Sequence, residues 1–289
     1  MTDRKVSTAT LIGVVLCVLA LVSGCSPSSP TSAATDSGTT TTQGRPPTST
    51  KPLEPLPPPP DTGTCRDLNF GDINRYSNTT ASRSCERPHT AYTFAVTTLP
   101  DDIAFEGVAI KNRAVQEAAA SSCRTEFTPY VGGDAATRAL VRLTATYFLP
   151  DQASFDRGAH WVRCDIIALQ AEKILAELPV RLKGALDDPD IVSAYGLCSG
   201  GQPGTAESVM VTCNQPHAFR AVAALRLGGT EEPYPGESVT RDDGQQRCED
   251  LIKSVVEEGG GYTFSWTYPT AADWQAGQRF GYCWNKTSA

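Results

Sequence analysis

The chain has 289 residues, of which 40% are hydrophobic, and its formal net charge of −7 gives an isoelectric point near 5.1. This acidic balance argues against nucleic acid as a partner and against electrostatic binding to an anionic membrane surface. The sequence also contains no Gly-rich phosphate loop, no His-Glu-x-x-His motif and no Gly-x-Ser-x-Gly motif. We therefore expect a protein that is not an enzyme and has no cofactor.

The N-terminus has the features of an export signal. Arg4 and Lys5 precede an apolar run over residues 11–22, which is too short to span a bilayer and typical of a signal-peptide core. The run ends in Val22-Ser-Gly-Cys25, the pattern of a bacterial lipobox. We expect a signal peptide over residues 1–24 and acyl chains such as palmitate on Cys25, which would anchor the protein on the extracytoplasmic face of the cell membrane. The alternative is an ordinary signal peptide with an incidental cysteine.

The next segment, residues 25–63, is composed mainly of Ser, Thr, Pro and Gly. It has too few large apolar residues to offset the entropy lost on ordering, so we expect a disordered tether. As a flexible coil it would reach roughly 35 Å from the membrane. The folded part would then begin near residue 64.

The remaining chain contains an internal repeat, which is marked by two series of four cysteines. The second cysteine of each series opens the same motif, Cys85-Glu-Arg-Pro-His89 and Cys213-Asn-Gln-Pro-His217. The fourth cysteine of each closes a stretch of the same pattern, residues 147–164 and 266–283, in which Pro, two aromatic residues, Gly and Cys recur without a gap. We therefore predict two copies of one module, over residues 64–185 and 186–289.

Each module is predicted to be a small α+β unit with one helix on an antiparallel sheet. Apolar residues at helical spacing predict helices over residues 106–127 and 240–256. A proline at the first helical position is expected to start a short turn that ends at Gly158 or Gly277. The expected strands are rich in β-forming residues and cover residues 87–99, 140–149 and 161–169 in the first module, and 215–227, 262–268 and 279–284 in the second.

The eight cysteines after Cys25 are expected to form disulfides, because export places them in an oxidising compartment. If the four cysteines of each module pair with one another, and both modules have the same pairing, three disulfide patterns remain. We favour first with second and third with fourth: Cys65–Cys85, Cys123–Cys164, Cys198–Cys213 and Cys248–Cys283. A zinc site at Cys85 and His89, or a Cys/His nucleophile, would need free thiols and is less favoured, so no metal ligand is assigned.

The two Pro-His histidines have two interpretations. Either His89 and His217 hold their turns through a hydrogen bond to a backbone carbonyl, which we favour, or they contact a ligand or partner. His160 has no histidine counterpart in the second module and is expected to be exposed. Trp266 and Trp284 have no tryptophan counterparts in the first module, so they are candidates for exposed contacts.

The combination of these features resembles a known family. The Cys-x-x-Pro-His motif, the cysteine-bearing helix and the Pro-to-Cys ending resemble the septum formation domain of actinobacterial envelope proteins, from about Cys65 to Asn285. The resemblance implies a lipoprotein of an actinobacterium that takes part in septum formation during division, and it names no reaction. Many members carry an acidic residue three places after the histidine, where this chain has Tyr92 and Arg220. If the acidic residue is needed for a ligand that the family shares, this chain has lost or changed that function.

We therefore expect a non-enzymatic extracytoplasmic lipoprotein connected with septum formation or cell-wall processes. Its partners would be the membrane, through the lipid anchor, and another envelope or division protein or a wall polymer, and not nucleic acid. One alternative is an envelope protein that binds a small ligand or a metal through the Pro-His turns. The other is a thiol- or metal-dependent hydrolase of the wall.

Overall fold

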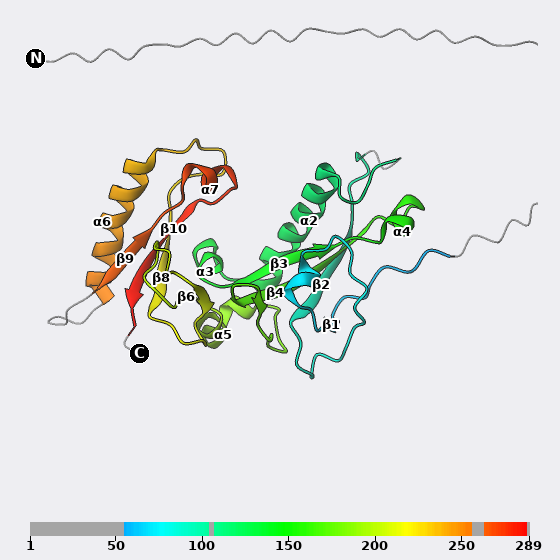
Figure 1. Cartoon of the computed structure of the whole chain (residues 1–289), viewed down its shortest axis with the longest axis horizontal. Coiled ribbons are helices and arrows are strands. Elements are labelled where there is room, and N and C mark those ends of the chain that lie inside the picture. The colour runs from blue at the N-terminus through cyan, green and yellow to red at the C-terminus, as the bar shows by residue number, and fades with distance from the viewer. Residues whose placement is uncertain (1–54, 104–106, 256–262, 288–289) are drawn as a thin grey trace, which may run out of the picture. The chain divides into compact units, whose positions relative to one another are not determined.

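The computed structural model describes residues 55–103, 107–255 and 263–287, which form two antiparallel sheets, each accompanied by one long helix (Figure 1). The predicted signal peptide, Cys25 and residues 26–54 of the predicted tether lie outside the described residues. Within the described part, no helix is long and apolar enough to cross a membrane. The mixed helix and antiparallel sheet architecture predicted for both modules is confirmed.

The first module contains a sheet of order β1-β2-β4-β3, with β5 paired to β4. Its strands are β1 (Cys65–Arg66), β2 (Ala91–Thr98), β3 (Leu143–Phe148), β4 (Trp161–Ala171) and β5 (Ile174–Leu175). Its helices are α1 (Phe70–Ile73), α2 (Arg113–Val131), α3 (Ala135–Ala139) and α4 (Gln152–Asp156). The long helix α2 starts later than predicted because the Asn112 side chain accepts a hydrogen bond from the Ala114 amide and caps it there.

The second module contains a sheet of order β7-β6-β8-β10-β9. Its strands are β6 (Leu197–Ser199), β7 (Met210–Thr212), β8 (Phe219–Arg226), β9 (Phe264–Thr267) and β10 (Phe280–Lys286). Its helices are α6 (Glu237–Val255) and α7 (Ala271–Gln275), and the connection from the first module carries η1 (Ala185–Asp187) and α5 (Pro189–Ala194). Residues of α5 pack against the core of the first module, so the second sheet begins only at Leu197.

The short helices α4 and α7 differ in one detail from the prediction. Pro150 and Pro269 do not stand at the first helical position, because Asp151 and Thr270 cap the two helices one residue later. In both helices the cap side chain accepts a backbone N–H, from Ser154 or Asp273, which satisfies a donor of the first turn and sets the helix start.

Four strands have the same order in the two sheets, β1-β2-β4-β3 and β6-β8-β10-β9, and the same register around the cysteines. Tyr147 lies opposite Cys164 in the first sheet, and Trp266 lies opposite Cys283 in the second. The register slips at equivalent positions of the β2–β4 and β8–β10 pairs, between Thr93 and Ala95 in β2 and between Ala221 and Ala223 in β8. These registers agree with the alignment of the two sequence repeats, so residues can be compared position by position between the modules.

The long helix of each module is joined by a disulfide to the last long strand of its sheet. Disulfides link Cys123 of α2 to Cys164 of β4 and Cys248 of α6 to Cys283 of β10, and all four cysteines are buried. Around them lie the apolar cores of the two modules, which include Val115, Ala119 and Ile166 in the first and Ile252 in the second. The other two disulfides are Cys65–Cys85 and Cys198–Cys213, so the four bridges have the pairing that the sequence favoured.

The expectation that Trp284 is exposed is wrong, and Trp266 is half-buried and not fully exposed. Trp284 is only 1% exposed, and its indole nitrogen donates to the Thr267 hydroxyl. Trp266 packs against α6 beside Gly244 and donates its indole N–H to the backbone carbonyl of Thr240. Both tryptophans thus serve the packing of the second module.

His160 is also not fully exposed, because its ring lies partly buried beside Phe155, with 4.9 Å between the ring centroids. The neighbouring aromatic ring shields one side of the imidazole. The position is therefore part of the packing near α4.

Candidate functional site

The two Pro-His turns have the same hydrogen bond at their centre. Nδ1 of His89 lies 2.8 Å from the carbonyl oxygen of Arg87, and Nδ1 of His217 lies 2.7 Å from that of Gln215. Because a carbonyl can only accept, Nδ1 must carry the proton in both rings. Each imidazole therefore closes its own turn, which is the geometry of the favoured structural interpretation.

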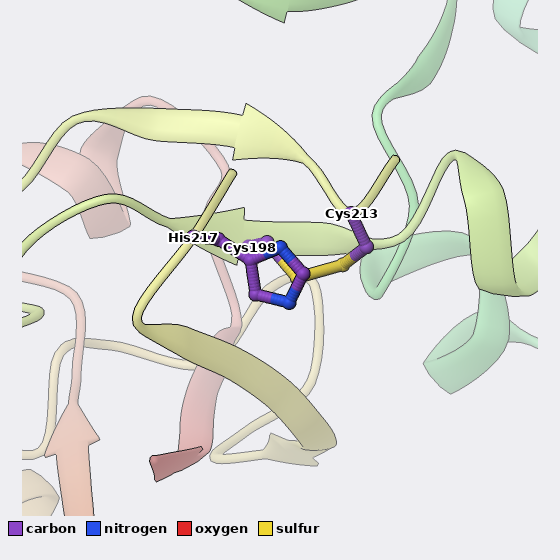
Figure 2. A group of neighbouring side chains, drawn as sticks. All are labelled: Cys198, Cys213 and His217. Carbon is purple, nitrogen blue, oxygen red and sulfur yellow. A yellow bond between two sulfur atoms is a disulfide. The ribbon is translucent and has the colours of Figure 1, made fainter. Parts of the chain in front are cut away.

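The two histidines differ in exposure. His89 is 2% exposed, its Nε2 is buried without a hydrogen-bond partner, and its backbone carbonyl accepts from the Leu178 amide. His217 is half-buried and lies on the Cys198–Cys213 disulfide (Figure 2). Of the two rings, only that of His217 offers part of its surface to a partner.

The cluster of Cys198, Cys213 and His217 resembles a metal-ligand set by distance, because its sulfur and nitrogen atoms lie within 4.8 Å of one another. The two sulfurs are bonded at 1.98 Å, however, so neither is a thiolate. A metal ligand or a nucleophile at cysteine must be the thiolate. The oxidised cluster therefore supports neither the zinc site nor the thiol nucleophile considered from the sequence.

Replacing the two histidines separately should show their structural role. His89→Ala removes a buried ring and its hydrogen bond, so we expect a loss of about 1–2 kcal/mol in the free energy of unfolding. His217→Ala should cost less than about 1 kcal/mol, because its ring is partly solvated. Urea titration of the two variants beside the parent measures both values. Unchanged stability of His89→Ala would contradict the structural interpretation.

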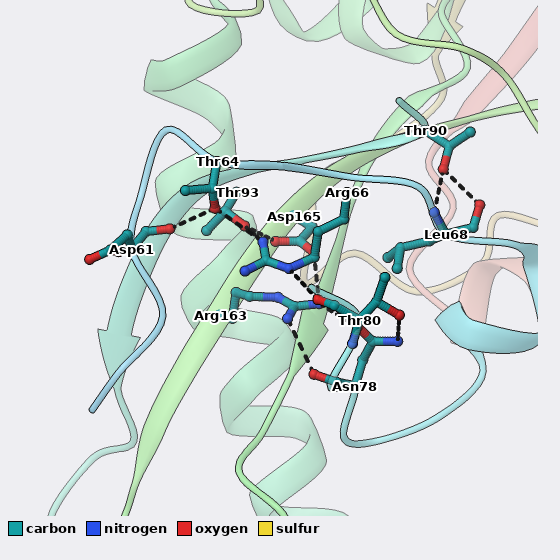
Figure 3. A network of polar contacts seen from close by, with 10 residues as sticks. All are labelled: Asp61, Thr64, Arg66, Leu68, Asn78, Thr80, Thr90, Thr93, Arg163 and Asp165. Carbon is teal, nitrogen blue, oxygen red and sulfur yellow. Dashed lines mark hydrogen bonds and ion pairs between the residues drawn. The ribbon is translucent and has the colours of Figure 1, made fainter. Parts of the chain in front are cut away.

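The sheet face that points away from the long helix is the second candidate region. In the first module this face carries a buried polar network of Arg66, Thr93, Arg163 and Asp165 (Figure 3). The guanidinium of Arg163 lies 3.0 Å from the Asp165 carboxylate, and Arg66 donates to the Thr93 hydroxyl, which donates to Asp165. None of these side chains is more than 6% exposed.

A loop segment of the first module, residues 76–80, covers this face. Three carbonyl groups at alternate residues accept hydrogen bonds from the sheet or its edge. The Tyr76 carbonyl accepts from the Leu149 amide at 2.7 Å, and the Asn78 carbonyl accepts from Arg163 at 3.3 Å. The Thr80 carbonyl accepts from Arg66 at 3.1 Å. In the first module, therefore, the face is closed by the chain itself.

The second module leaves the same face open. A pocket of about 550 Å³ lies there, with an aromatic floor from β10 and walls from the β6–β7 loop and α7. Its lining includes Leu197, Ser208, Met210, Thr267, Tyr268, Asp273, Ala276, Gln278, Phe280, Tyr282 and Trp284. The volume lies in the range of small-molecule and side-chain binding pockets.

The difference between the modules follows from the residues at equivalent positions. In β10, Tyr282 and Trp284 stand where β4 has Arg163 and Asp165, so the buried charges are replaced by aromatic rings. The cysteines that flank the covering loop are 20 residues apart in the first module and 15 in the second. The shorter loop does not reach across the face, which leaves the pocket.

Tyr282 is one of the polar residues that line the pocket. The Gln278 side-chain amide donates to its phenol oxygen at 3.0 Å. Burial raises the pKa of Tyr282, and the hydrogen bond from Gln278 opposes this shift only in part. The phenol therefore stays protonated near neutral pH, and no described residue accepts its O–H.

The pocket was not predicted from the sequence. The available signals were the loop length between the first two cysteines of each series and the exchange of Arg163 and Asp165 for aromatic residues. Both are differences between the modules, whereas the repeated motifs consist of what the modules share.

Comparison with known proteins gives one family match. A family model described as septum formation matches residues 62–283, which is more than half of the chain. No curated protein and no solved structure matches the chain.

Proposed function

Because the chain belongs to the septum formation family, a membership that connects it with septum formation and cell division, we propose that it acts as a non-enzymatic binding protein of the cell envelope. The observation that carries this proposal is the open pocket of the second module, whose lining includes aromatic rings and the Tyr282 hydroxyl. Such a lining can bind and orient a ligand, and it contains no nucleophile paired with a base.

The state of the cysteines supports a binding role over hydrolysis. All eight cysteines of the described part are joined in disulfides, so a thiol-dependent wall hydrolase would lack its nucleophile. Among the residues that the structure describes, the one buried carboxylate–guanidinium pair is Asp165 with Arg163, and Arg163 also donates to the Asn78 carbonyl of residues 76–80. These groups are occupied in holding the fold.

The place of action in this proposal is the outer face of the cell membrane, in an actinobacterium. Export through residues 1–24, a lipid on Cys25 and a tether over residues 25–63 would carry two copies of the module. The tether would let the pocket of the second module meet a division protein or wall-associated partner at some distance from the bilayer.

A strain that lacks the chain tests this function. We expect delayed or misplaced septa, restored when the parent chain is expressed. Cys25→Ala should leave the protein uncleaved or release it from the membrane fraction, and restoration should fail because the mature, lipid-anchored form is not made. Fractionation, intact-mass analysis and septum counts measure these effects. Normal septa in the strain without the chain would contradict the function, whereas a Cys25→Ala variant that is still cut and anchored would contradict only the lipidation.

A further inference from the structure

The pocket of the second module has a covered counterpart, which indicates what could fill it. In the first module, residues 76–80 lie over the equivalent face, and the carbonyls of Tyr76, Asn78 and Thr80 accept hydrogen bonds from donors of the module. These acceptors stand at every second residue, and the Asn78 side chain also accepts from the Thr80 amide. The first module therefore holds a peptide segment of its own chain on this face through backbone carbonyls.

Two of the three donors have equivalents in the second module that are free to bind. Tyr268 is equivalent to Leu149, and among the described residues none accepts a hydrogen bond from its amide. Tyr282 is equivalent to Arg163, and its O–H has no acceptor in the described part. The third donor, Arg66, is replaced by Ser199, whose hydroxyl donates to the Gly201 carbonyl within its own loop.

The rest of the pocket is suited to an apolar side chain. Phe280 and Tyr282 are half-buried, and Trp284 is buried. The indole N–H of Trp284 already donates to the Thr267 hydroxyl. Leu197 and Met210 complete this apolar surface from β6 and β7. A side chain from a peptide laid across the donors would enter between these groups, where burial of apolar surface adds to binding.

We propose that the pocket of the second module binds a short peptide segment of a partner protein. Carbonyl groups two residues apart in that segment accept hydrogen bonds from the Tyr282 hydroxyl and the Tyr268 amide, and an apolar side chain of the segment lies on Phe280. This proposal rests on the proposed binding function and names the chemical class of the partner at that site. It also gives the two modules different roles, because the first module's face is filled by its own residues 76–80.

Selection from a library of random displayed peptides on the full chain in detergent tests this proposal. We expect enriched peptides that share an apolar residue and bind saturably. Ala276→Trp, which places a large ring at the exposed rim of the pocket, should abolish binding. Arg157→Trp, at the equivalent position of the first module, is the matched control and should leave binding unchanged. Tyr282→Phe keeps the ring but removes the donor, so it should weaken binding about 3- to 10-fold.

Two outcomes would overturn the proposal: no peptide enriched above the Ala276→Trp background, or enriched peptides that bind parent and Ala276→Trp equally. Unchanged melting temperatures of the variants exclude unfolding as the cause of lost binding. If septa are delayed or misplaced in the strain without the chain, and yet no peptide binds, only the assignment of a peptide as the ligand is wrong. If peptides bind and that strain divides normally, the connection with septation is wrong and the peptide site remains.

Discussion

Asp165→Ala should lower the free energy of unfolding by about 3–5 kcal/mol, because it leaves two buried arginines without their only buried carboxylate among the described residues. Arg163 and Asp165 are 2% and 0% exposed, and their charged atoms lie 3.0 Å apart. Burial lowers the pKa of Arg163, and Asp165 opposes that shift. Without the carboxylate, the guanidinium keeps its desolvation cost and loses the charge that offsets it.

Chemical denaturation of parent and variant measures this effect, and an exposed ion pair provides the control. Arg113 and Glu117 form a surface pair in α2 at 2.7 Å, so Glu117→Ala should cost no more than about 1 kcal/mol. A loss below about 1 kcal/mol for Asp165→Ala would contradict the view that this pair holds residues 76–80 on the sheet.

Gly244→Ala should destabilise the second module by about 3 kcal/mol, although the same change in an exposed helix interior stabilises by up to about 1 kcal/mol. A Cβ at residue 244 would lie 2.0 Å from Cζ2 of Trp266, and the three nearest atoms all belong to that indole. The tryptophan cannot move away freely, because its ring also lies against Gly281 and its N–H donates to Thr240. The clash therefore outweighs the gain in helix propensity.

The first module shows how this clash can be relieved. It has Ala119 at the position of Gly244 and Tyr147 at the position of Trp266. In a Trp266→Tyr background, Gly244→Ala should therefore become neutral or stabilising. A double-mutant cycle by urea titration measures the coupling between the two positions. The same loss in both backgrounds would show that Trp266 is not the residue that requires glycine.

The fold was largely predictable because its features are repeated in the sequence. Two cysteine series, two Pro-His motifs and two aromatic endings identified the modules, and the parallel arrangement of cysteines reduced the disulfide patterns to three. The strands and long helices followed from apolar periodicity, with errors at their ends where caps such as Asn112 set the start.

The pocket and the burial of the tryptophans were not predictable in the same way. Whether Trp266 is exposed depends on Gly244 and Gly281, which are far from it in sequence and leave room for its ring only when α6 and β10 meet. The face is open because the shorter loop of the second module does not cover it. No sequence motif marks the absence of a covering segment. Differences between repeated modules, such as Arg163 against Tyr282, were the only sequence signal for it.

We propose that the open face of the second module is the binding site through which the chain acts in septum formation. The most direct measurement expresses the parent, Arg157→Trp or Ala276→Trp in a strain without the chain. Each protein is present in the membrane in the same amount, and the position and frequency of septa are counted. The parent and Arg157→Trp should restore normal septum position and frequency, whereas Ala276→Trp should leave the defect in place. Full restoration by Ala276→Trp would contradict the claim, since a chain with its pocket blocked would then perform the function.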